Sequence, residues 1–136
     1  LADAALLLVE RNLASHALMR MLLTPETRSV DIAFSAEDAV ERMTSAHFDH
    51  ILIEGASVDG SDDIRAILSA ATASGSKTTL LAAPSEQLSK TEIFASGVDQ
   101  VILKPVGAAD LIASLRALYA GRKDQAEDEP PVRIAS

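Results

Sequence analysis

Five short apolar runs, each followed by a stretch in which apolar residues recur at helical spacing, constrain the fold of this 136-residue chain more than any other feature. An apolar run without alternation predicts a strand that is buried on both faces, as strands in parallel sheets are. The predicted strands are 4–9, 28–34, 49–54, 78–83 and 98–103. The predicted helices are 12–23, 35–45, 62–73, 84–96 and 108–120.

Capping residues mark several helix boundaries. Asn12 is a typical N-cap, and Ser35 with Asp38 three residues later resembles a capping box. Gly97 and Gly121 follow the last two helical stretches, where glycine commonly ends a helix. In the first helix, a stripe of apolar residues at helical spacing predicts the side that packs on the sheet: Leu18, Met19, Leu22 and Leu23.

Strict alternation of strands and helices predicts a (βα)₅ protein with right-handed crossovers and a doubly wound parallel sheet. The expected strand order is 2-1-3-4-5, which places the functional edge at the carboxyl ends of the first and third strands. We assign residues 1–121 to this one domain. Residues 122–136 are acidic and contain two prolines, so they are predicted to be a linker to another domain.

Composition excludes several classes of protein. Hydrophobic residues make up 48% of the chain and aromatic residues 3%, so the core must be aliphatic. A net charge of −8 argues against a DNA-binding or other nucleic-acid-binding role. The chain has no cysteine, no apolar run near the ~20 residues of a membrane span and no basic segment typical of a signal peptide, which favours a cytoplasmic protein. Three histidines lack metal-ligand spacing and are expected at the surface: His16, His47 and His50.

Three segments carry a resemblance to a known family. They are Val9-Glu10-Arg11-Asn12, the stretch from Phe48 to Glu54, and Val101-Ile102-Leu103-Lys104-Pro105. Over residues 4–121 the chain resembles the receiver domains of bacterial response regulators. The resemblance implies a site where two acids hold Mg²⁺ and an Asp accepts a phosphoryl group, assisted by a Ser or Thr and a Lys.

The family site is degenerate in this chain. Arg11 follows Glu10 where the family has a second acid, and a guanidinium beside the site repels Mg²⁺. Glu54 stands at the phosphoacceptor position, and its extra methylene moves the carboxylate by about an ångström, which disturbs in-line attack. Ala82 or Ala83 stands where the family has a hydroxyl, and Val101 where it often has an aromatic residue.

Lys104, followed by Pro105, is the remaining match to the family's reactive residues. Lys104 is placed to pair with Glu54 across the edge of the sheet. We therefore predict a receiver that is not phosphorylated, binds no Mg²⁺, has no catalytic residue and is not an enzyme. The alternative is a conventional phosphoacceptor receiver that uses a carboxylate such as Glu54. A flavodoxin-like cofactor binder shares the fold, but the loop after the first strand lacks a phosphate cradle rich in Ser, Thr and Gly.

The last helix suggests a binding surface. Arg116 and Tyr119 fall on one flank of it, and a guanidinium with an aromatic ring suits a guanine base or a phosphate. Because some degenerate receivers recognise cyclic di-GMP, this second messenger is a candidate ligand, with candidate contacts from Lys104, Pro105, Arg116, Tyr119 and Arg122. The same residues are equally well explained as a solvated edge.

The resemblance also implies a role. We expect a pseudo-receiver from a hybrid sensor histidine kinase, attached to the kinase core or to a neighbouring receiver. It would regulate the phosphorelay by intramolecular docking through the face formed by the fourth helix, the fifth strand and the last helix. Control would then come from a difference in affinity for two states of the partner.

Overall fold

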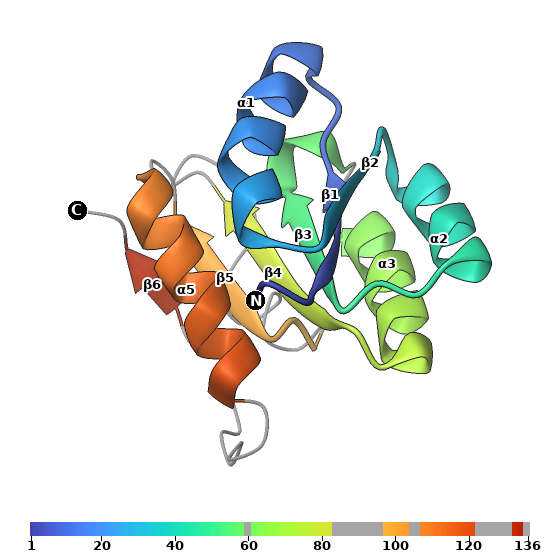
Figure 1. Cartoon of the computed structure of the whole chain (residues 1–136). Coiled ribbons are helices and arrows are strands. Elements are labelled where there is room, and N and C mark those ends of the chain that lie inside the picture. The colour runs from blue at the N-terminus through green and yellow to red at the C-terminus, as the bar shows by residue number, and fades with distance from the viewer. Residues whose placement is uncertain (59–60, 83–96, 104–106, 122–131, 135–136) are drawn as a thin grey trace.

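The computed structural model describes residues 1–58, 61–82, 97–103, 107–121 and 132–134, with the main chain alone for residues 56, 61, 119–121 and 132–134. It consists of one parallel sheet with helices on both faces (Figure 1). The predicted helix 84–96 lies outside the described residues. In chain order the elements are β1 (Ala5–Val9), α1 (Leu13–Leu23), η1 (Thr24–Glu26), β2 (Ser29–Ala33), α2 (Ala36–Ser45), β3 (His50–Glu54), η2 (Gly55–Ser57), α3 (Ser61–Ser74), β4 (Lys77–Ala82), β5 (Gln100–Leu103), α5 (Ala108–Gly121) and β6 (Val132–Ile134).

The predicted strand order is confirmed, and one strand is added to it. The sheet runs β2-β1-β3-β4-β5-β6, and every neighbouring pair is parallel. The sequence prediction assigned the residues of β6 to a linker, because three residues are too few to show an alternating pattern. Residues 122–131 of that predicted linker lie outside the described part of the chain.

The predicted caps form by the expected contacts. The Asn12 side chain accepts a hydrogen bond from the Ala14 N–H, at 2.9 Å. Ser35 Oγ accepts from the Asp38 N–H at 3.1 Å, and the Asp38 carboxylate in turn accepts from the Phe34 N–H at 2.9 Å. The first bond satisfies an N–H group in the first turn of α2, and the second ties the residue before the N-cap to that turn, so together they fix where α2 begins.

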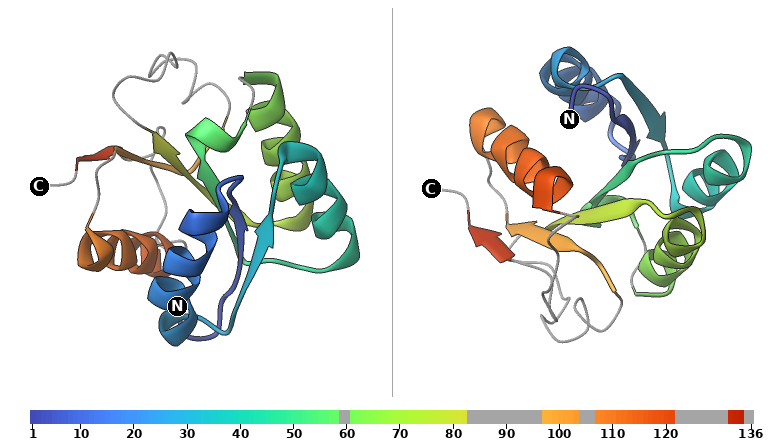
Figure 2. Two further views of the ribbon diagram at one scale, coloured as in Figure 1. Left: turned by 90° about the horizontal axis from the view of Figure 1, so that it is seen from above. Right: turned by 60° about the horizontal axis from the view of Figure 1, so that its bottom comes forward.

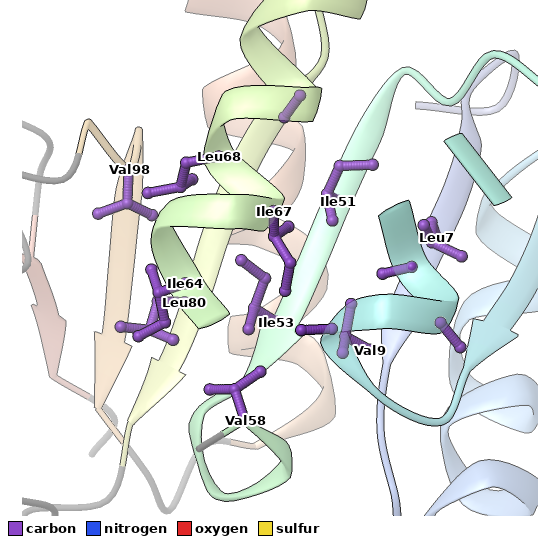
Figure 3. Close-up of a cluster of buried hydrophobic side chains, with 14 of the residues drawn as sticks. Leu7, Val9, Ile51, Ile53, Val58, Ile64, Ile67, Leu68, Leu80 and Val98 are labelled. Atoms are coloured by element: carbon purple, nitrogen blue, oxygen red, sulfur yellow. The ribbon is translucent and has the colours of Figure 1, made fainter. Parts of the chain in front are cut away.

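Two aliphatic clusters hold the helices on the sheet. One cluster lies between the sheet and helices α2 and α3, with Ile51, Ile53 and Ile67 fully buried in it (Figure 3). The other lies on the opposite face under α1 and α5, and includes Leu23 and Leu115. Figure 2 shows α1 and α5 together on one side of the sheet and α2 and α3 on the other. The prediction of an aliphatic core is confirmed for the described residues, in which Phe48 is the only aromatic member of either cluster.

Helix α1 packs less closely than its sequence predicts. Leu23 is its only buried residue. Leu18, which we predicted to face the sheet, is 57% exposed, and Leu13 and Met21 are more exposed still. The prediction was wrong for Leu18 because Met19 and Leu23 define the inward side, and Leu18 lies about 100° away from Met19 on the helix.

Candidate functional site

Two acidic residues lie at the carboxyl ends of neighbouring strands, as the sequence predicts. Glu10 follows β1 directly, and Glu54 is the last residue of β3. Because Val9 pairs in register with Ile53, the next positions along the two strands are Glu10 and Glu54. Both residues are buried, at 7% and 8% exposure. This edge is therefore the place where a receiver-like site would lie.

Arg11 and Ser57 tie the end of β1 to the turn after β3. The Arg11 main-chain N–H donates to Ser57 Oγ at 2.8 Å, and its guanidinium Nη2 donates to the Ser57 carbonyl oxygen at 3.0 Å. The Ser57 hydroxyl in turn donates a hydrogen bond to Glu10 Oε2, at 2.9 Å. The Asn12 N–H also donates to Glu10 Oε2, at 3.2 Å. A guanidinium, a buried hydroxyl and a carboxylate thus form one connected group.

This set of donors does not suit a divalent metal ion. Magnesium requires about six oxygen ligands close to an octahedron, and it is repelled by a neighbouring positive charge. Here the Arg11 guanidinium donates a hydrogen bond to the Ser57 carbonyl oxygen, and Glu10 Oε2 already accepts two hydrogen bonds. Among the residues that the structure describes, no three His, Asp or Glu side chains gather in a way that could hold a metal.

The positions that would serve phosphoryl transfer carry apolar side chains. Ala82, at the end of β4, is 4% exposed and packs in the cluster under α3. Val101 of β5 is 2% exposed and packs in the same cluster. Neither side chain has a hydrogen-bonding group. Ala83, the other candidate for the hydroxyl position, lies outside the described residues, as do Lys104 and Pro105, the predicted match to the family.

The predicted ligand surface on α5 is described at one residue only. The Arg116 guanidinium, 59% exposed, forms an ion pair with Glu26 of η1. This contact places Arg116 on the flank of α5 that faces the end of α1. The Tyr119 side chain and Arg122 lie outside the described part of the chain, so the grouping of these residues stays a prediction.

His50 is buried, which contradicts the prediction that all three histidines lie at the surface. Its side chain has 0% exposure, its Nε2 hydrogen-bonds with Thr79 Oγ1 at 2.7 Å, and its Nδ1 has no hydrogen-bond partner among the described residues. Burial, with a smaller contribution from Lys77 that outweighs the opposing effect of Asp49, lowers the pKa of His50 from 6.5 to about 4. The prediction failed because His50 begins β3 on the same face as Leu52, where α5 covers the sheet.

Ser57 is the functional residue that sequence reasoning missed. It lies in the turn after β3, and it is only 2% exposed although it is polar. A serine in a turn normally faces water, so the residue type gives no signal of burial. Its burial could be inferred only from the fold, which brings the turn after β3 next to Arg11 at the edge of the sheet.

Comparison with known proteins supports a receiver-like fold. Over 116 residues the chain is 24% identical to the transcriptional regulatory protein ResD of Bacillus subtilis (strain 168), which corresponds to 85% of this chain and 48% of ResD. The chain thus spans about half the length of this curated relative. No protein-family model matches the chain.

Solved structures agree over nearly the whole chain. A two-component response regulator from Clostridium difficile superposes with a TM-score of 0.75 at 19% identity, covering 90% of this chain and all of that one. A co-crystal structure of the Saccharomyces cerevisiae histidine phosphotransfer protein Ypd1 with the receiver domain of Ssk1 gives 0.73 at 18% identity, covering 89% and 92%. The sheet order and the two helical layers define a doubly wound α/β protein with parallel strands. More specifically, the chain has the fold of the receiver domains of response regulators.

Proposed function

We propose that this chain is a receiver domain of two-component signalling that is not phosphorylated, and that it regulates a histidine kinase phosphorelay by binding a protein partner. The partner is a kinase core or a neighbouring receiver domain, within the same polypeptide in a hybrid kinase. The bound surface is the face that combines β5, α5 and the predicted helix 84–96. The domain acts in the cytoplasm, without a metal ion and without catalysis.

The contact between Arg11 and Ser57 is the observation that carries this proposal. Phosphoryl transfer depends on positive charge that neutralises the oxygens of the transferred group, and receivers take that charge from a bound metal ion. In this chain the positive charge at the same edge belongs to Arg11 and is directed at the main chain of the turn. A guanidinium held in this way competes with a metal ion for the edge.

Two further positions support the proposal. Glu54 reaches farther from the strand than an Asp at the same place, and a displacement of about an ångström can cost a large part of the rate of a positioned reaction. Ala82 offers no hydroxyl to a phosphoryl group and instead fills the aliphatic cluster. A domain that lacks the acceptor Asp and the hydroxyl keeps the same fold, and the surface of that fold is sufficient for docking to a protein.

The nature of the partner rests on the solved structures that match. Ypd1 and the Ssk1 receiver domain form a complex between a histidine phosphotransfer protein and a receiver. A chain of the same fold offers helices and a sheet edge of the same layout to a similar partner. We infer that this chain likewise binds a protein of the phosphorelay, a kinase core or a neighbouring receiver domain, and that binding changes the partner's equilibrium between two states.

Phosphorylation in solution tests the proposal directly. The native chain is incubated with acetyl phosphate and Mg²⁺, and its intact mass is measured. We expect no phosphoryl adduct. A stable adduct mapped to Glu54 would establish the alternative, a conventional receiver that uses a glutamate as acceptor.

A restored variant sharpens the test. Arg11→Asp combined with Glu54→Asp removes the guanidinium, adds a carboxylate and shortens the acceptor side chain. We expect this variant to bind Mg²⁺ in calorimetry, whereas the native chain and the matched control, Arg11→Gln with Glu54→Asp, do not. Magnesium binding by the native chain, or its absence in the restored variant, would show that these two residues do not decide metal binding.

Cyclic di-GMP is the ligand that we propose as a regulator of docking. The Arg116 guanidinium is the described group that suits its phosphate, and the carboxylate of Glu26 now occupies it. A bound nucleotide would take the place of that carboxylate. Calorimetry with native protein and Arg116→Ala tests this, and absence of heat at about 100 µM nucleotide would remove cyclic di-GMP from the proposal.

A further inference from the structure

The sixth strand closes the edge of the sheet next to β5. Its three residues pair with β5 in parallel, with Val101 opposite Val132, Ile102 opposite Arg133 and Leu103 opposite Ile134. Figure 1 shows β6 beside β5 at the end of the sheet that is farthest from β2. Without β6, the outward N–H and C=O groups of β5 would form an open edge, which is a ready template for another strand.

The connection from β5 to β6 has an unusual hand. The step from β3 to β4 runs in the same direction across the sheet as the step from β5 to β6. Helix α3 makes the first crossover on one face of the sheet, whereas α5 lies on the opposite face, beside α1. The crossover through α5 therefore has the opposite hand to the crossover through α3. About 98% of such crossovers share the right hand, so chain connectivity does not favour this position for β6.

The pairing must therefore be favoured by the strand itself. Val132 and Ile134 are β-branched residues, which are enriched in strands. Pro131 precedes them and has no N–H to donate, so a ladder cannot extend through it as a donor. A ladder of three residues makes few hydrogen bonds, each of modest net strength, and such a strand can leave and return.

We propose that the outer edge of β5 is a strand-acceptor site, and that segment Val132–Ile134 is its exchangeable occupant. The same segment from a second copy of the chain fits the site equally well in register, and it avoids the unfavourable hand of the crossover. The site would recognise an extended peptide with an apolar, a basic and an apolar residue in sequence, which pairs with β5 through its main chain. If the face that includes β5 is the docking face, which rests on the proposed function, the segment must leave before a partner reaches β5.

Proline substitution in the full-length chain tests the site. Successive N–H groups of a strand point to opposite sides, so in Arg133→Pro with Ile134→Pro one of the two lost N–H groups faces β5. The matched control, Arg133→Ala with Ile134→Val, keeps both N–H groups. Amide hydrogen exchange of residues 100–103 is measured by NMR, because the amides that face β4 provide an internal reference.

We expect the outward amides of β5 to exchange at least about tenfold faster in the proline variant than in the native chain and the control, with the inward amides unchanged. A synthetic peptide of residues 131–136, at a few times the millimolar effective concentration of a short tether, should restore their protection. Outward amides that exchange equally fast in all three proteins would overturn the inference, and so would a peptide without effect. Neither result depends on phosphorylation, so failure of the acceptor site and failure of the proposed function are separate outcomes.

Discussion

Lowering the pH from 6.5 toward 4 should destabilise this protein through His50. Burial lowers the pKa of the folded histidine to about 4, whereas in the unfolded chain it stays near 6.5. Between these values the unfolded state takes up a proton that the folded state does not, so the free energy of unfolding falls as the pH falls. The contribution of His50 is complete above pH 6.5 and is lost by about pH 4. The difference between the two pKa values corresponds to about 3 kcal/mol.

Urea unfolding at several pH values across this range measures the effect. Because many carboxylates titrate in the same range, the informative quantity is the difference between the native chain and His50→Leu, which keeps a side chain of similar size. We expect the native chain to lose about 3 kcal/mol more than the variant. His47→Leu is the control for removal of a histidine at the surface, because His47 is 56% exposed and its ion pair with Asp49 is not buried. Parallel curves for the native chain and His50→Leu would refute the argument.

Three other substitutions test contacts described above. Ser57→Ala removes the donor to one buried carboxylate oxygen and the acceptor of a main-chain N–H, so it should lower the free energy of unfolding by about 2–4 kcal/mol. The control Ser69→Ala, on the exposed side of α3, should change it by less than about 0.5 kcal/mol. Urea unfolding measures both, and equal effects would show that the buried hydroxyl has no role. Glu26→Gln should cost less than about 1 kcal/mol in the same assay, because solvent screens an ion pair whose side chains are 59% and 32% exposed. A larger loss would mean that this pair positions α5. Met21→Ser should leave the melting temperature within about 2 °C of the native value because Met21 is 75% exposed, and a clear drop would reveal packing that the structure does not have.

The fold could be predicted because its strongest signals are local. Buried strands such as Ala5–Val9 are apolar at every position, and the capping box at Ser35 determines where α2 begins. Alternation of such elements leaves few possible topologies, and the resemblance to receivers selected one of them. The placement of Glu10 and Glu54 at one edge of the sheet followed from the strand order alone.

The remaining features depend on contacts between distant segments. Nothing near Ser57 in the sequence indicates that its hydroxyl is buried between Arg11 and Glu10. Histidine is a polar residue type that we expected at the surface, and His50 is buried because its side chain lies on the face of the sheet that α5 covers. The short strand at Val132 is too brief for a periodic signal, and its position depends on an edge formed by β5.

The contact between Arg11 and Ser57 also bears on how this domain depends on the magnesium concentration around it. A magnesium ion comes from the solution, so it can be chelated, diluted or replaced by another metal. The guanidinium of Arg11 is a covalent part of the polypeptide, so no chelator can remove it. Under the proposed function this edge does not depend on magnesium supply, and EDTA should leave both the melting temperature and the partner affinity of the purified domain unaltered.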